Sequence, residues 1–133
     1  MNIKSIVRPI ICILLLAGCQ TQQFQIEGFE QEIWRADTNG CQGQRISLSE
    51  KLAEQKNKLI GLSEQEIRGF LGKPDKVELF VRSQKFYVYY IEPGKQCGGV
   101  IAKEGRNFYV RFNSVNTVSE ITLVLPYSLQ LPN

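Results

Sequence analysis

The spacing of apolar residues changes once along this chain, at Pro74-Asp75, and this change limits the folds that the chain can adopt. Before it, two segments place apolar side chains on one side of a helix. After it, apolar side chains occupy alternate positions, as they do in β-strands. Helices that precede a run of strands are typical of an α+β domain.

Each of the two predicted helices begins at a capping sequence. In Ser47-Leu48-Ser49-Glu50 and in Ser63-Glu64-Gln65-Glu66, a hydroxyl precedes a carboxylate by three residues, which satisfies the free amides of a helix start. We expect helices over about 48–58 and 64–71. Gly72 and Pro74 end the second helix, because glycine adopts the left-handed conformation after a helix and proline cannot continue one.

Alternating residues predict strands over about 77–82, 86–91, 108–112 and 118–125, with a short hairpin loop at 83–85. The sequence thus predicts an α+β two-layer sandwich, in which two helices are followed by a three- to four-stranded antiparallel sheet. Segment 29–45 has no clear period and is expected to form an irregular arm.

At the N-terminus, basic Lys4 and Arg8 precede an apolar run that ends in Leu16-Ala17-Gly18-Cys19. This segment resembles a bacterial lipoprotein signal peptide, and its last four residues resemble a lipobox. The apolar run suits a signal peptide and is shorter than the roughly 20 residues of a membrane span. The resemblance implies removal of 1–18 and lipid attachment at Cys19; an ordinary signal or an uncleaved anchor is the alternative.

Gln20 follows Cys19, the expected lipidation site, and in lipoproteins an Asp at this position would favour the inner membrane. The resemblance therefore implies a lipid anchor in the outer membrane, with the body facing the periplasm. Polar, glutamine-rich 19–28 is expected to be a flexible tether, and 29–133 a single domain.

Four cysteines are present, of which Cys12 would leave with the signal peptide and Cys19 would carry lipid. Cys41 and Cys97 would then share an oxidising compartment, which predicts a structural disulfide between them. A redox pair or a metal site are the alternatives, but the two cysteines form no Cys-x-x-Cys motif.

Several segments between residues 59 and 124 form a recognisable series of motifs. They are 59–63, Ile67 with Leu71-Gly72-Lys73-Pro74-Asp75, aromatic 86–90, and 109–113 leading to Val118 and Ile121. Over about 59–124 this series resembles the BamE (SmpA/OmlA) family of small outer-membrane lipoproteins. It implies two helices followed by a three-stranded antiparallel sheet. Inhibitor-like repeats that bind β-lactamases share the Leu-Gly-x-Pro-Asp motif, whereas the cysteine pair and the arm lie outside the BamE pattern.

Few residues suggest catalysis. The chain has no histidine, which excludes Ser-His-Asp and Cys-His machinery, and no Ser is followed by Lys three positions later. No glycine-rich loop opens a helix. We therefore expect no enzymatic activity, no cofactor and no metal site. The net charge of +3 includes Lys4 and Arg8 of the expected signal, so nucleic acid is not an expected partner.

The strand pattern also predicts an interaction surface. We expect the more aliphatic face of the sheet to cover the helices, with Val77, Leu79, Val81, Phe86, Val88, Tyr90, Phe108, Val110 and Phe112. The opposite face would then carry Phe80, Arg82, Tyr87, Tyr89, Tyr109 and Arg111, residue types that are enriched at protein interfaces. Alternatively, the arm around Trp34 or the tail at Leu129-Leu131 covers this face.

These features predict an outer-membrane lipoprotein that binds another envelope protein as a scaffold or assembly factor. A periplasmic inhibitor or a small-ligand binder is the alternative. A deep apolar pocket would favour the ligand binder, and an exposed aromatic sheet would favour the protein partner.

Overall fold

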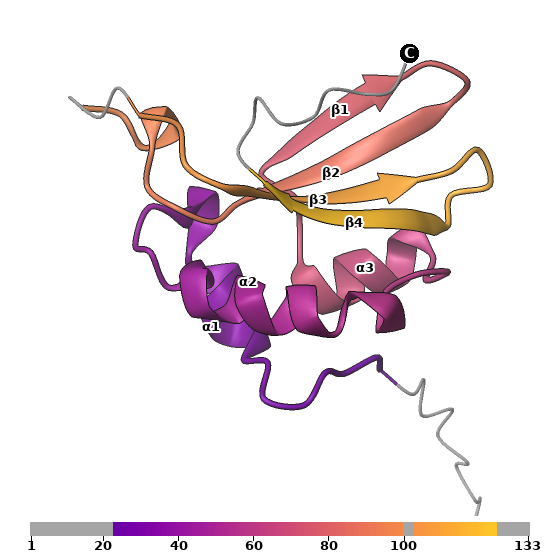
Figure 1. Cartoon of the computed structure of the whole chain (residues 1–133), viewed down its shortest axis with the longest axis horizontal. Helices are drawn as coiled ribbons and strands as arrows, with labels where there is room; N and C mark the ends of the chain where they lie inside the picture. The colour runs from indigo at the N-terminus through magenta and orange to yellow at the C-terminus, as the bar shows by residue number, and fades with distance from the viewer. Residues whose placement is uncertain (1–22, 100–102, 125–133) are drawn as a thin grey trace, which may run out of the picture.

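The computed structural model describes residues 23–99 and 103–124, which form an α+β domain with helices before strands (Figure 1). The helical part contains α1 (Gln31–Ala36), η1 (Thr38–Gly40), α2 (Arg45–Glu54), η2 (Lys56–Lys58) and α3 (Glu64–Leu71). The strands are β1 (Lys76–Phe80), β2 (Gln84–Tyr90), β3 (Asn107–Phe112) and β4 (Val118–Val124), with η3 (Lys95–Cys97) between β2 and β3.

The four strands form one antiparallel sheet in the order β1-β2-β3-β4. Figure 1 shows α1, α2 and α3 together on one side of this sheet, which gives the two layers that the sequence predicts. We call the side of the sheet that faces the helices the inner face, and the opposite side the outer face. The predicted α+β class is confirmed.

Helix α3 has the bounds that its capping signals predict. The Ser63 hydroxyl accepts a hydrogen bond from the Glu66 amide at 3.2 Å, and the Glu66 carboxylate accepts one from the Ser63 amide at 2.7 Å. The hydrogen bonds from Ser63 lower the pKa of Glu66. Gly72 ends the helix with φ +79°, in the left-handed region that favours glycine.

Helix α2 begins at Arg45, before the predicted capping sequence at Ser47. A side chain from before the helix caps its start: the buried Asp37 carboxylate accepts hydrogen bonds from the amides of Gln42 and Gln44, at 2.8 Å each, and from Arg45, the first helical residue, at 3.2 Å. The prediction at Ser47 was wrong because this residue lies inside the helix. The helix ends at Glu54, and the rest of the predicted segment forms η2.

The predicted irregular arm contains α1, which carries the fully buried Trp34 into the core. Its ring lies 5.8 Å from that of Tyr89 and 6.1 Å from that of Phe108, between centroids. Packing extends into the predicted tether: Ile26 is buried, and the Phe24 ring lies 4.9 Å from that of Phe70. Packing therefore begins before the expected domain start at residue 29.

The predicted orientation of β2 was wrong. Tyr87 and Tyr89 are buried on the inner face, whereas Phe86, Val88 and Tyr90 lie on the outer face. Both sets are apolar, so alternation alone does not select the one that faces the helices. The prediction for Phe108, Val110 and Phe112 of β3 is confirmed, since they are buried in the inner core.

The β1–β2 hairpin also differs from the prediction. The turn comprises residues 81–83 rather than 83–85, and Arg82 and Ser83 have φ of +58° and +57°. By register, Val77 and Leu79 share the inner side with Tyr87, yet both are exposed, because β1 is the edge strand.

Candidate functional site

The structure separates the six residues predicted to form one interaction surface. Phe80, Tyr109 and Arg111 lie on the outer face, and Arg82 lies in the β1–β2 turn. Tyr87 and Tyr89 are in the core, so their assignment to the surface was wrong. The arm that carries Trp34 packs against Tyr89 on the inner face, not over the opposite face as the alternative expected; Leu129 and Leu131 lie outside the described residues.

The two buried tyrosines have hydrogen-bond partners that make inner positions acceptable for them. Tyr89 donates to the Gly72 carbonyl at 2.9 Å, and burial raises its pKa. The Tyr87 hydroxyl donates to Glu64 and accepts from Arg68 Nε at 2.8 Å. Both rings therefore lie in the core with their hydroxyls bonded to helix α3 or its C-cap.

The outer face is not a free aromatic surface. Phe86, Val88 and Tyr109 form a small buried cluster there. Arg111 lies over the Phe86 ring, with its guanidinium carbon 5.8 Å from the centroid. It also donates to Gln84 at 2.9 Å and to Glu120 at 3.1 Å. The aromatic and basic groups of this face thus partner one another.

Exposed apolar residues instead gather along β1 and the following turn. We call this set the β1 strip: Val77, Leu79, Phe80 and Val81. Leu79 is 82% exposed and Val81 65% exposed, although both are large and apolar. Among residues 23–99 and 103–124, β1 pairs only with β2, and no described strand lies along its other edge. An apolar edge strand of this kind is a site where another chain can add a strand.

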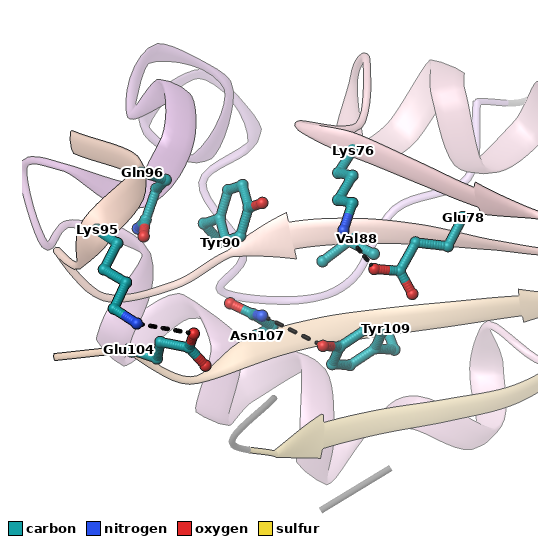
Figure 2. Close-up of a pocket in the computed structure, with 10 residues that line it drawn as sticks. Lys76, Glu78, Val88, Tyr90, Lys95, Gln96, Glu104, Asn107 and Tyr109 are labelled. Atoms are coloured by element: carbon teal, nitrogen blue, oxygen red, sulfur yellow. Dashed lines mark hydrogen bonds and ion pairs between the residues drawn. The ribbon is translucent and has the colours of Figure 1, made fainter. Parts of the chain in front are cut away.

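A cavity of about 360 Å³ lies on the outer face, where β1, β2, β3 and η3 meet. Figure 2 shows Lys76 with Glu78 at one end and Lys95 with Glu104 at the other, with tyrosine and asparagine side chains between them. The ammonium-to-carboxylate distances are 2.7 and 3.4 Å. Its floor includes the buried side chains of Val88 and Tyr109.

A buried ion pair joins the arm, helix α2 and the start of the sheet. Arg45 Nη1 lies 2.5 Å from the Asp75 carboxylate, and these side chains are 2% and 3% exposed. Arg45 also donates to the carbonyls of Trp34 at 2.8 Å and Tyr90 at 3.0 Å. Asp75 accepts hydrogen bonds from the amides of Asn39 at 3.0 Å and Tyr90 at 2.9 Å.

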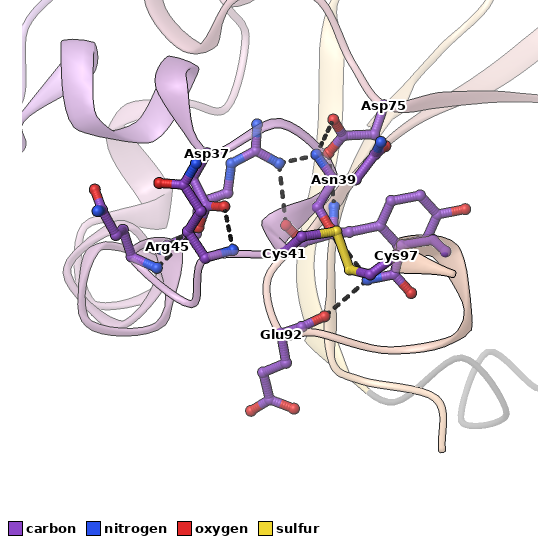
Figure 3. Close-up of a disulfide and its surroundings, with 11 residues drawn as sticks. Asp37, Asn39, Cys41, Arg45, Asp75, Glu92 and Cys97 are labelled. Carbon is purple, nitrogen blue, oxygen red and sulfur yellow. Dashed lines mark hydrogen bonds and ion pairs between the residues drawn. A yellow bond between two sulfur atoms is a disulfide. The ribbon is translucent and has the colours of Figure 1, made fainter. Parts of the chain in front are cut away.

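The predicted disulfide between Cys41 and Cys97 is confirmed, with the two Cα atoms 5.6 Å apart. Figure 3 shows it beside the Arg45–Asp75 pair, where it links the segment after η1 to η3. Gln96 supports the same link, since it donates to the carbonyls of Asn39 at 3.0 Å and Glu92 at 2.8 Å. These contacts stabilise one end of the sheet, next to the outer-face cavity.

Within residues 23–99 and 103–124, no group of three or more His, Cys, Asp or Glu side chains is placed to hold a metal ion. In the same ranges, no helix has the length and apolar character needed to cross a bilayer. The predicted lipidation site at Cys19 lies outside the described residues.

Comparisons of the chain with protein-family models, with curated proteins and with solved structures gave no match.

Proposed function

We propose that this protein is a periplasmic lipoprotein, anchored to the outer membrane through Cys19, that binds another envelope protein as a scaffold or assembly factor. The exposed β1 strip carries this proposal. The sequence supports the anchor through its lipobox-like Leu16-Ala17-Gly18-Cys19. The order of capped helix, Leu-Gly-x-Pro-Asp turn and antiparallel sheet agrees with the fold that the BamE-like resemblance implies.

The β1 strip is suited to binding an extended segment of a protein. Natural edge strands are usually short, charged or covered, because unpaired backbone groups beside apolar side chains attract other strands. In β1 the inner-side positions Val77 and Leu79 are apolar and exposed, and Val81 continues the strip into the turn. A partner strand would gain backbone hydrogen bonds from β1 and cover these side chains.

Photocrosslinking tests this surface in living cells of the native host. A benzoylphenylalanine probe at Val81 should give a discrete adduct with a partner protein, and the same probe at Gln65, exposed on helix α3, should not. Adding Leu79→Asp to the Val81 probe should reduce the adduct at least about 10-fold, since central apolar contacts dominate interface energies. The same substitution should change the free energy of unfolding by less than about 0.5 kcal/mol, because Leu79 is exposed.

Equal adducts from the probes at positions 65 and 81 would contradict a specific surface at the β1 strip. An adduct from Val81 that Leu79→Asp leaves unchanged would contradict the central place given to Leu79.

Lipidation is tested separately. Cys19→Ala should abolish labelling by radioactive palmitate and leave the precursor unprocessed, because the proposed anchor needs the thiol of this cysteine. Cys12→Ala is the matched control and should be labelled as the wild type is. Normal labelling of the Cys19→Ala protein would rule out the lipoprotein proposal, whatever the crosslinking shows.

A further inference from the structure

The outer-face cavity has hydrogen-bonding groups that the fold leaves available. The Tyr109 hydroxyl accepts a hydrogen bond from Asn107 Nδ2 at 3.2 Å, and its own proton has no acceptor among the described residues. The Tyr90 hydroxyl likewise has no hydrogen-bond partner in the part of the chain that the structure describes. Figure 2 shows both tyrosines between the two ion pairs, with the Tyr109 hydroxyl beside the Asn107 amide.

Four charged side chains line the cavity, and they form two ion pairs. Lys76 is paired with Glu78, and Lys95 with Glu104. Lys76, Glu78 and Lys95 are also partly exposed, so they keep capacity for further hydrogen bonds: an ammonium has three donors, and a carboxylate has about four acceptor sites. A ligand with a net charge would have to compete with one member of a pair, whereas a neutral polar ligand can bond to both.

The arrangement of these pairs specifies the ligand further. A donor and an acceptor stand side by side in each pair, which matches two neighbouring hydroxyls: one accepts from the ammonium and the other donates to the carboxylate. The Tyr90 and Tyr109 rings and Val88 supply apolar surface between the pairs. A sugar ring combines these properties, because it has adjacent hydroxyls on its edge and C–H groups on its face.

We propose that this cavity binds one neutral sugar residue. Its volume of about 360 Å³ is near the lower end of the roughly 300–1,000 Å³ of ligand pockets, which suits a single ring. The sugar is either free or the end of a glycan chain, since both present the same hydroxyls. The site is separate from the β1 strip, because none of the four strip residues lines the cavity, and only Phe80 of the strip shares the outer face with it.

Saturation-transfer difference NMR tests the site with the full-length lipoprotein in dodecylphosphocholine micelles, a detergent without sugar. The probes are the methyl glycosides of glucose, galactose, mannose and N-acetylglucosamine, with maltotriose and chitotriose to represent glycan chains. At least one neutral probe should bind with a millimolar or lower dissociation constant. Tighter binding of a trisaccharide would identify a glycan chain as the source, and equal binding a free sugar.

Removing the hydroxyls of Tyr90 and Tyr109 together is the most direct test of the sugar site. Tyr90→Phe combined with Tyr109→Phe should weaken binding at least about 10-fold, since two hydrogen bonds to the sugar are lost. Tyr89→Phe is the matched control, because it removes a hydroxyl from the inner face of the same sheet, and it should bind like the wild type. Glucosamine and glucuronate, which carry opposite charges, should each bind more weakly than the neutral methyl glucoside.

The proposal fails if no neutral probe receives saturation from the wild-type protein. It also fails if the tyrosine double variant binds as the wild type does, or if a charged sugar binds more tightly than its neutral counterpart. Leu79→Asp should bind the sugar normally, so loss of partner crosslinking and loss of sugar binding are distinguishable.

Discussion

Arg45→Met should lower the free energy of unfolding by about 3–5 kcal/mol, the range found when one partner of a buried ion pair is removed. The Asp75 carboxylate would remain buried without its counter-charge, since its side chain is only 3% exposed. The carbonyls of Trp34 and Tyr90 would also lose a donor. Urea denaturation followed by circular dichroism measures the change, through the shift of the midpoint at constant slope.

Two further variants distinguish the buried charge from a general loss of contacts. Lys95→Met removes one member of the Lys95–Glu104 pair, in which the lysine is 56% exposed, and should cost less than about 1 kcal/mol. Adding Asp75→Asn to Arg45→Met should cost less than the sum of the single changes, because the double variant buries no unpaired charge. Additive effects, or a loss below about 1 kcal/mol for Arg45→Met, would show that the pair is not a major stabilising element.

The parts of the fold that the sequence predicts correctly are those that local signals determine. Helix α3 has its capping box at Ser63 and Glu66, and it ends at Gly72, all within ten residues of each other. Helix α2 has no comparable local signal at its start, because Asp37 caps it from eight residues before Arg45. A side chain that reaches across a turn to cap a helix leaves no fixed spacing in the sequence.

The orientation of β2 shows a second limit. Phe86, Val88 and Tyr90 are as apolar as Tyr87 and Tyr89, so burial alone gives no preference between the two orientations. The choice depends on tertiary contacts: the Tyr89 hydroxyl reaches the Gly72 carbonyl at the end of α3, and the Tyr89 ring packs against Trp34. Neither contact has a signature in the strand sequence itself.

The candidate sites also depend on tertiary structure more than on local sequence signals. The exposed apolar strip includes Phe80 from the predicted surface, but Leu79 and Val81 were expected to face the core. Leu79 is exposed because β1 is at the sheet edge, and Val81 because it lies in the turn after β1. The cavity combines residues from three strands and from η3, so no local motif could identify it. Lys76 and Glu78 alternate with Val77 in a pattern that indicates only the outer side of a strand.

Cys41→Ser and Cys97→Ser should each lower the free energy of unfolding by about 4 kcal/mol, because the disulfide restricts an unfolded chain over a separation of 56 residues. The double variant should be little less stable than either single variant, since each change opens the same loop. Without the bridge, η3 is held to the arm by weaker contacts such as the hydrogen bond from Gln96 to the Asn39 carbonyl. The loss of stability should therefore appear first as faster amide hydrogen exchange in η3. Thermal denaturation with and without dithiothreitol provides the control, because the reductant should destabilise the wild type and leave the double variant unchanged. Two titratable thiols at Cys41 and Cys97 in protein purified without reductant, or single variants as stable as the wild type, would contradict a stabilising disulfide at this position.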